Sequence, residues 1–439
     1  MQTRKTISLL SLTGAALLAA SLASAQENRP TLPSLNAPEV EPFDFRVEPT
    51  KRIIRELENP FNYQGNPITF GSFRVWPNLT LRQEYDDNIF ATKDGKESDF
   101  ISVVTPALEA WKSFGRHNFK LRAESEIRHH WDNDSENIQN HSLAFDGDIE
   151  ARKVLNIPVR VTYNDRHLSR KTQRRSSANQ LAVAPLNIKR LEAESGFVYK
   201  PNRLELSLLG NYKSIRLGNE DLINGGRLIR DNRDSNSKSA KARLTYDLKE
   251  DISPFLEVSY TDQEFINEDP SLQSRNNTST RILAGANFNF KDLVTGFVGL
   301  GLDNNNFEEN SIESTNDISL NAKVSWEPTT KTSLTLNASR ATSEDNELIA
   351  QLTETNLGLE VQHELQKDLF GRVNLDYKDN NFSETGRRDT TYDLGFEAIK
   401  FITPNLHIGA GYSFTTQNST INGLGFNNSV IFLRARLAL

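Results

Sequence analysis

From about residue 72 to the end of the chain, apolar and polar residues alternate one by one. In residues 238–249 the apolar positions are Ala240, Ala242, Leu244, Tyr246 and Leu248, and the positions between them are Lys241, Arg243, Thr245, Asp247 and Lys249. The same alternation runs through residues 119–128, 278–291 and 316–327. Successive side chains of a strand point to opposite faces, so the pattern predicts β-strands with one apolar face and one charged face.

The links between these strands alternate in length. Short links lie near Gly115 and Asp292, whereas segments such as 217–237, 344–352 and 381–389 are longer and polar. We predict an all-β fold, a transmembrane antiparallel up-and-down β-barrel of about 18 strands with short periplasmic turns and long extracellular loops. The alternative is a soluble solenoid or sandwich, but a solenoid shows one fixed repeat without alternating loop lengths.

Strand length and aromatic positions agree with a membrane barrel. Strands of about 13 residues, tilted by about 40°, rise roughly 33 Å, more than the apolar band of about 25 Å that such a barrel presents. Aromatic rings favour the two membrane interfaces. Near one end of the predicted strands lie Tyr85, Trp131, Tyr163, Tyr212, Tyr260, Tyr377 and Tyr412, and near the other lie Tyr199, Tyr246, Phe290 and Trp326.

The two ends of the chain suggest export and assembly. Residues 1–25 contain Arg4 and Lys5, an apolar stretch and a closing Ala-Ser-Ala, which predicts a cleaved secretory signal peptide rather than a single membrane anchor. Residues 26–71 are rich in proline and predict a periplasmic tether, with a plug or a partner-docking arm as the alternatives. The final strand of the predicted barrel (72–439) resembles the assembly signal of bacterial outer-membrane barrels, although it ends on Leu439 rather than Phe or Trp. We therefore expect barrel assembly machinery as a partner and the bacterial outer membrane as the location.

Composition narrows the function classes. The chain has 439 residues with 51 Lys and Arg against 58 Asp and Glu, a net charge of -7 and no Cys. The acidic excess argues against nucleic acid as a partner, and the absence of Cys excludes disulfides and thiolate chemistry. Mean hydropathy is -0.56, and no repeated apolar runs of about 20 residues occur, which excludes a bundle of membrane helices. A barrel remains open because it needs apolar residues only at alternate positions.

Candidate catalytic and metal-binding sets are weak. His129 and His130 are neighbours on a predicted strand and point to opposite faces, so they cannot hold one ion together. The run from Asp303 to Asn310 is rich in oxygen ligands but lacks the glycine and spaced glutamate of a calcium loop, and we interpret it as a solvated turn. We therefore expect no catalytic, cofactor-binding or metal-binding residues and no enzymatic activity.

The inward face of the predicted barrel is strongly charged. An 18-strand barrel is wide enough for an aqueous channel, and so many charges require water around them. Cross-strand ion pairs that brace the wall are compatible with such a channel. The residues that we expect to line the lumen are Lys120, Arg122, Glu124, Glu126, Arg128, Asp148, Arg160, Lys241, Arg243, Arg281, Lys323, Glu360, Arg372, Asp376, Arg434 and Arg436.

One predicted extracellular loop carries only positive charge. Its basic residues are Arg170, Lys171, Arg174 and Arg175. The loop could fold toward the channel mouth and attract an anionic solute. It could equally bind the phosphates of neighbouring lipopolysaccharide.

The first predicted hairpin carries a recognisable motif. Residues 76–90 read WPNLTLRQEYDDNIF, and Val104-Thr105-Pro106 follows. This motif, with Tyr85, Asp86, Asp87, Asn88 and Phe90, resembles that of the putative β-barrel porin family, type 2. The resemblance implies an association with exopolysaccharide biosynthesis and export. From the residues alone, Asp86, Asp87 and Asn88 predict a turn with Asx-type hydrogen bonds at the top of the first strand.

Together these features predict an outer-membrane channel, and the resemblance implies that it secretes an exopolysaccharide. The alternatives are a general or anion-preferring diffusion porin and a structural or adhesin barrel without a channel. The expected partners are outer-membrane lipids and lipopolysaccharide, and the resemblance adds a periplasmic polysaccharide-export protein. The sequence does not identify the transported polymer.

Overall fold

The computed structural model describes residues 61, 65–177, 181–266, 274–309, 312–345 and 350–438. The predicted signal peptide, most of the proline-rich segment and Leu439 lie outside the described residues.

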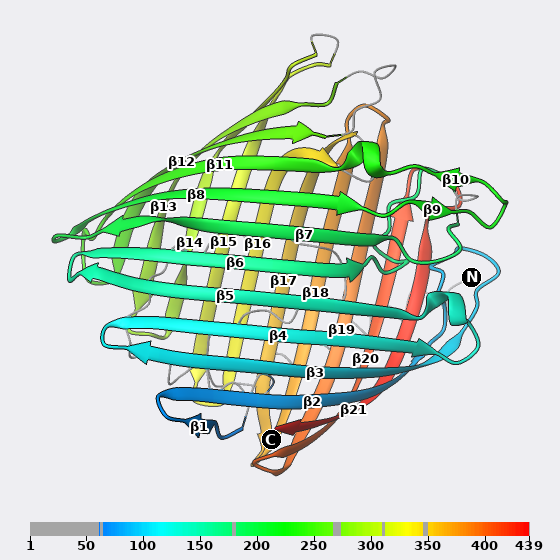
Figure 1. Ribbon diagram of the computed structural model, residues 1–439, viewed down its shortest axis with the longest axis horizontal. Coiled ribbons are helices and arrows are strands. Elements are labelled where there is room, and N and C mark those ends of the chain that lie inside the picture. The colour runs from blue at the N-terminus through cyan, green and yellow to red at the C-terminus, as the bar shows by residue number, and fades with distance from the viewer. Residues whose placement is uncertain are drawn as a thin grey trace, which may run out of the picture.

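Eighteen antiparallel strands form one closed barrel, which confirms the predicted fold. They are β2 (Phe73–Asp86), β3 (Asp99–Phe114), β4 (His117–His130), β5 (Ile138–Arg152), β6 (Leu155–His167), β7 (Asn187–Tyr199), β8 (Leu204–Leu217), β11 (Ser235–Tyr246), β12 (Ile252–Phe265), β13 (Asn277–Phe290), β14 (Val294–Phe307), β15 (Thr315–Thr329), β16 (Thr332–Asp345), β17 (Ala350–Gln366), β18 (Leu369–Phe382), β19 (Arg387–Thr403), β20 (Leu406–Ser419) and β21 (Phe426–Ala438). Each strand pairs with its neighbours in the chain, and β21 pairs with β2 to close the ring. In Figure 1 the near wall, β2–β8, and the far wall, β15–β20, cross at a steep angle, as tilted strands of a closed barrel do.

Short strands and single-turn helices lie at the two rims of the barrel. The short strand β1 (Ile68–Phe70) pairs with the beginning of β2. The hairpin of β9 (Glu220–Asp221) and β10 (Arg227–Leu228) lies in the long link after β8. Two single-turn helices, η1 (Asp134–Glu136) and η2 (Asp231–Arg233), also lie in long links. No helix in the described part of the chain is long and apolar enough to cross a membrane.

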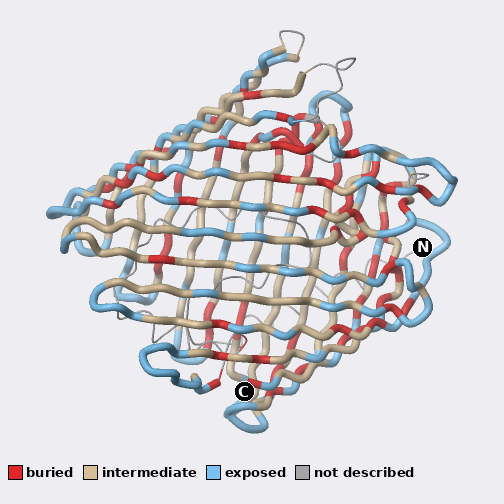
Figure 2. The backbone as a smooth tube through the Cα atoms, in the orientation of Figure 1, coloured by how far each residue is buried: buried red, intermediate tan, exposed pale blue. Residues whose placement is uncertain are grey.

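The alternation of the sequence becomes the two faces of the wall. On β4, Leu121 and Ile127 are 41% and 39% exposed on the outer face, while Arg122 and Arg128 form ion pairs on the inner face. The predicted aromatic residues Trp131, Tyr199 and Trp326 are exposed on the outside as well. Buried positions gather toward the end of the barrel that carries β9 and β10 (Figure 2). The barrel is therefore apolar outside and polar inside.

Two links are shorter than predicted. The links after β16 and β18 comprise only residues 346–349 and 383–386, because strand pairing continues into polar sequence at the tops of these hairpins. Backbone hydrogen bonds maintain that pairing, and Leu352 packs against Phe382 where β17 and β18 pair.

The prediction of a solvated turn was wrong for residues 303–307. These residues belong to β14, and Asp303 is fully buried. It accepts hydrogen bonds from Ser279 and Arg281 on the neighbouring strand β13, which explains how a carboxylate is tolerated there.

Candidate functional site: the lumen and its long-loop mouth

The inner wall is built around carboxylates that each bind two cations. Glu109 on β3 forms ion pairs of 3.0 Å with both Lys120 and Arg122 of β4. Glu84 on β2 binds Arg128 at 2.7 Å and Arg82 at 3.0 Å. These side chains meet because alternate residues of neighbouring strands share one face.

The same arrangement recurs where the barrel closes. Glu397 on β19 binds Arg434 of β21 at 3.0 Å and also binds Arg372 of β18. Arg372 lies 3.8 Å from Glu360 of β17 as well. The carboxylate of Glu397 thus ties together strands on both sides of β20.

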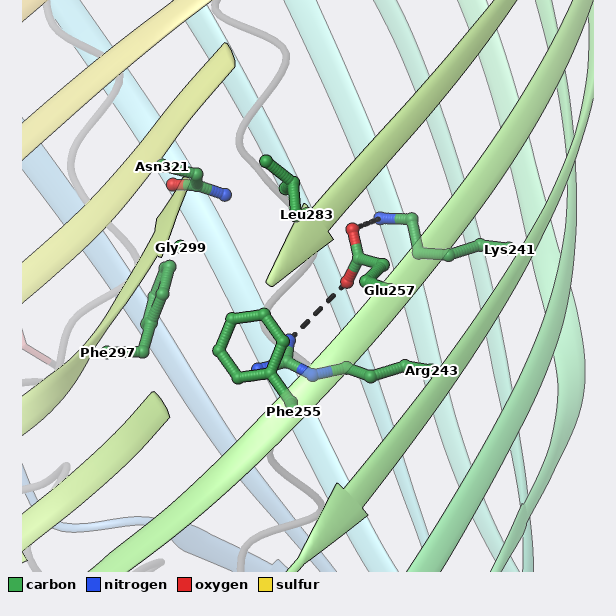
Figure 3. Close-up of a pocket in the computed structure, with 8 residues that line it drawn as sticks. All are labelled: Lys241, Arg243, Phe255, Glu257, Leu283, Phe297, Gly299 and Asn321. Atoms are coloured by element: carbon green, nitrogen blue, oxygen red, sulfur yellow. Dashed lines mark ion pairs between the residues drawn. The ribbon is translucent and has the colours of Figure 1, made fainter. Parts of the chain in front are cut away.

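Figure 3 shows a fourth such group, on β11 and β12. Glu257 lies 3.9 Å from Lys241 and 3.5 Å from Arg243, and the two ion pairs are drawn as dashed lines. The guanidinium of Arg243 stacks on the ring of Phe255, 3.6 Å from its centroid. The ring has space because Gly285 faces it: a Cβ there would lie 2.6 Å from Phe255 Cζ.

The other predicted lining residues occupy the inner face, with varied partners. Arg281 binds Asp303 at 2.6 Å, Arg160 binds Asp146 at 2.9 Å, and Asp148 accepts a hydrogen bond from Asn156. Glu126 accepts a hydrogen bond from Asn140 and lines a small hollow with Glu124. Strand register places Lys323, Asp376 and Arg436 on the same face.

Several acids that organise this wall were missing from the sequence prediction. Glu84, Glu109, Glu257 and Asp303 each receive one or two cations, yet the predicted lining set does not contain them. Their position in the two-residue alternation is the signal that could have identified them, because each lies on the charged face of its strand.

The basic loop folds into the barrel mouth. We call residues 168–177 the crossing loop. Lys171 lies 3.4 Å from Asp86 on β2. Arg174 forms an ion pair with Asp345 at the end of β16 and lies 3.4 Å from Glu354 on β17. In the ring of 18 strands, β17 is about half a circumference from β6, where the loop begins. The loop therefore spans the mouth from one wall to the opposite one.

The remaining basic residues of the crossing loop also bind within the protein. Arg170, which is 6% exposed, forms an ion pair with Glu136 of η1. Arg175, which is 8% exposed, donates a hydrogen bond of 3.0 Å to the carbonyl of Ala91. All four predicted cations of this loop thus face partners of the same chain rather than the surrounding lipid. Of the two interpretations of the loop, the structure agrees with folding toward the mouth.

A second loop clamps the two long hairpins of the far wall. Arg275, in the link after β12, donates hydrogen bonds of 2.7 and 2.8 Å to Glu344 at the end of β16. It donates two more, of 3.0 and 2.7 Å, to Glu384 in the link after β18. These hydrogen bonds hold the pKa of the Glu384 carboxyl below its usual value. The clamp therefore joins both hairpins to the link after β12.

The sequence motif of the first hairpin lies at the seam where the barrel closes. Asp86 accepts a hydrogen bond of 2.9 Å from the backbone N–H of Asn88, which is the expected Asx turn, and another from Asn428 of β21. Asp87 accepts a hydrogen bond from the backbone N–H of Ser429. Asn88 is fully buried and donates a hydrogen bond of 2.8 Å to the carbonyl of Asn427.

The other two motif residues, Tyr85 and Phe90, contact residues of β3 and of the crossing loop. Tyr85 is on the outer face and packs on Phe100, with ring centroids 5.1 Å apart. Phe90 lies near the guanidinium of Arg170 at 5.9 Å. The motif therefore fastens the first strand to the last and supports the crossing loop.

Within the described residues, no group of three or more His, Asp or Glu side chains is close enough to hold a metal ion. His129 is exposed on the outer face and His130 is buried on the inner one, as predicted.

Known proteins resemble the chain in fold and in sequence profile. Solved structures with a similar fold include Pseudomonas aeruginosa OpdK with vanillate, at 10% identity and a TM-score of 0.44 over 83% of this chain and 99% of that one. Pseudomonas aeruginosa OpdO has 13% identity and a TM-score of 0.45 over 83% and 97% of the two chains. The copper transporter OprC has 10% identity and a TM-score of 0.46 over 85% of this chain and 82% of that one. No curated protein sequence matches the chain.

The profile of the family described as Putative beta-barrel porin 2 matches residues 59–439, which include the whole barrel. The short turns of such barrels face the periplasm and the long loops face the outside, so the crossing loop lies at the extracellular mouth. The chain belongs to the Putative beta-barrel porin 2 family and is a porin-like barrel channel of the bacterial outer membrane.

Proposed function

We propose that the protein is a restricted conduit for a secreted exopolysaccharide rather than an enzyme or an open diffusion porin. The observation that carries the restricted character is the crossing loop, whose ion pairs reach Asp86 on β2 and Glu354 on β17. A loop fixed across the mouth obstructs the free passage of solutes. The exopolysaccharide itself rests on the family resemblance.

The lumen offers groups that suit an uncharged or weakly charged polymer. Asn321, Ser339 and Asn356 follow one another across three strands of the inner face. Amide and hydroxyl groups donate and accept hydrogen bonds with sugar hydroxyls. Because the wall carboxylates and cations are largely paired with one another, they offer little net attraction for a small ion.

The anion-preferring porin is the second candidate. The basic loop favoured that interpretation in the sequence, but Lys171 and Arg174 are neutralised by carboxylates of the same chain. Their charge therefore contributes little to the field that an approaching anion would meet. A structural or adhesin barrel differs from both candidates because it would conduct no ions.

The proposal has a direct genetic test. The gene is deleted, and cell-surface polysaccharide is measured with and without complementation by the full-length chain. We expect export to fall on deletion and to return on complementation. Unchanged export in the deletion strain would overturn the conduit.

Conductance separates the remaining candidates. The purified chain in a planar bilayer should open rarely or with low conductance if the crossing loop restricts it. A stable, wide-open pore would favour the diffusion porin.

The proposal includes a route to the membrane and a set of partners. A signal peptide at residues 1–25 would direct the chain to the periplasm, and barrel assembly machinery would insert it among outer-membrane lipids and lipopolysaccharide. A periplasmic polysaccharide-export protein would deliver the polymer. The proline-rich segment, residues 26–71, would lie on the periplasmic side, next to that protein.

A further inference from the structure

An aromatic residue from outside the barrel wall is buried at the periplasmic mouth. Phe61 precedes the first strand and is only 1% exposed. The guanidinium of Arg372 lies over its ring, 4.6 Å from the centroid. Arg372 is on β18, near the periplasmic turn and on the inner face. Phe61 therefore lies inside the mouth.

Arg372 is held in place for this contact. Its guanidinium binds Glu397 and lies 3.8 Å from Glu360, and Glu397 is itself bound by Arg434. A cation fixed by the wall presents its flat face to an aromatic ring at little cost in side-chain freedom. The site that receives Phe61 is therefore held in place by residues of the barrel wall alone.

The wall around Arg372 is unusually apolar for an inward face. Phe370 and Ile399 pair across β18 and β19, and Phe401 follows on β19. The ring of Phe401 lies 5.5 Å from Phe370 and 3.9 Å from His407 of β20. We call Phe370, Ile399, Phe401, His407 and Arg372 the aromatic patch. Ile399 is 1% exposed and His407 is 3% exposed, whereas Phe370 and Phe401 are partly buried.

Gly65 is a second point at which the residues before β2 lie against the wall. A Cβ on Gly65 would lie 2.7 Å from Cβ of Ala438, at the periplasmic end of β21. Gly65 has φ +77°, a conformation that favours glycine. Phe61 and Gly65 therefore both contact the periplasmic end of the wall, at β18 and at β21.

From these contacts we propose that the aromatic patch is a docking surface for the chain's own N-terminal segment, with Phe61 as its anchor. The docked ring of Phe61 lies in the periplasmic opening and narrows it. This inference rests on the proposed channel for its consequence, but the docking itself does not depend on transport. A periplasmic partner that opens the channel would have to displace Phe61.

Docking is tested by photo-cross-linking in the full-length chain. Phe61 is replaced by p-benzoylphenylalanine, which keeps an aromatic ring, and cross-linked peptides are identified by mass spectrometry. We expect attachment to residues 369–382 of β18. The control replaces Phe114, which is 66% exposed at the periplasmic turn after β3, and should give no attachment to β18.

Narrowing is tested by conductance in planar bilayers. Phe61→Ala should raise the open population about tenfold, because burial of the aromatic side chain favours the docked state over the released state by at least a factor of ten. Phe61→Tyr should behave like the wild type, and Phe114→Ala should have no effect. Wild-type conductance in Phe61→Ala would overturn the narrowing.

The two measurements separate failure of docking from failure of the channel. If every variant conducts like the wild type and no cross-link to β18 forms, docking is overturned and the channel stands. If no variant conducts but the cross-link forms, the channel is overturned and the docking surface stands.

Discussion

Arg174→Gln should release the crossing loop from the far wall. Arg174 binds Asp345, which is 2% exposed at its side chain, and Glu354. Removing one partner of a buried ion pair costs about 3–5 kcal/mol. The cost should be lower here, about 1.5–3 kcal/mol, because Arg174 is 19% exposed and Glu354 keeps an ion pair of 2.9 Å with Lys378. Since 1.4 kcal/mol is a factor of ten, the open population of the mouth should rise by about 10- to 100-fold.

The assay is single-channel recording of the purified full-length chain in planar bilayers. Open probability and open-state conductance are compared for the wild type and Arg174→Gln. The matched control is Arg227→Gln, because Arg227 and Asp221 form an extracellular ion pair whose side chains are 60% and 69% exposed. An exposed ion pair of this kind contributes about 0–1 kcal/mol to stability, so this variant should show the open probability and conductance of the wild type.

Two results would refute this reasoning. Wild-type open probability in Arg174→Gln would mean that the ion pairs do not hold the mouth closed. An equal rise in Arg227→Gln would mean that the effect is a general response to lost surface charge.

Three further predictions concern stability and pH. Asn88→Ala should loosen the seam by about 2–4 kcal/mol, because it removes several hydrogen bonds of a buried side chain, and should lower the temperature at which the unboiled barrel unfolds on a gel. Gly285→Ala should destabilise the barrel by about 1–3 kcal/mol, because the added Cβ would lie 2.6 Å from Phe255 Cζ and 2.1 Å from the carbonyl oxygen of Val298. Gly210→Ala should not destabilise it, because the nearest atom to a Cβ at that position is 3.9 Å away. Because hydrogen bonds from Arg275 lower the pKa of Glu384, this contact should persist at neutral pH and be lost only as the pH falls below the usual range of a glutamate pKa. Amide exchange in residues 383–386 should then become faster, after correction for the intrinsic rate.

Each of these predictions has its own control. Asn224→Ala removes an exposed Asx hydrogen bond and should leave the unfolding temperature unchanged. A similar loss in Asn224→Ala and Asn88→Ala would contradict the role of the seam. Equal stability of the two glycine variants would contradict the packing of Phe255. Glu384→Gln should remove the pH dependence of exchange, and a dependence that survives in this variant has another origin.

The wall could be predicted from the sequence because its rule is local. Leu121 and Arg122 take opposite faces simply because they are neighbours on a strand, and the closed ring follows from many such strands in alternating direction. The same rule placed the predicted lining residues on the inner face. It failed at Asp303, where a polar run looked like a turn and proved to be strand.

The crossing loop could not be predicted because its contacts are distant in sequence. Arg174 and Asp345 are separated by 171 residues, and no spacing rule relates them. Composition marked the loop as basic, but the choice between lipid phosphates and the mouth depended on where the acids of β2, β16 and β17 meet in space. Phe61 poses the same problem, since nothing in its local sequence indicates Arg372 as its partner.

The central claim is a closed wall that faces lipid outside and water inside. Leu300 and Asn321 test it, because Asn321 pairs with Gly299 and the two side chains lie at nearly the same level on opposite faces. The chain has no Cys, so Leu300→Cys and Asn321→Cys each introduce a single thiol. In proteoliposomes, a charged, membrane-impermeant thiol reagent should modify Asn321→Cys and spare Leu300→Cys. Modification of Leu300→Cys with Asn321→Cys left unmodified would contradict the account.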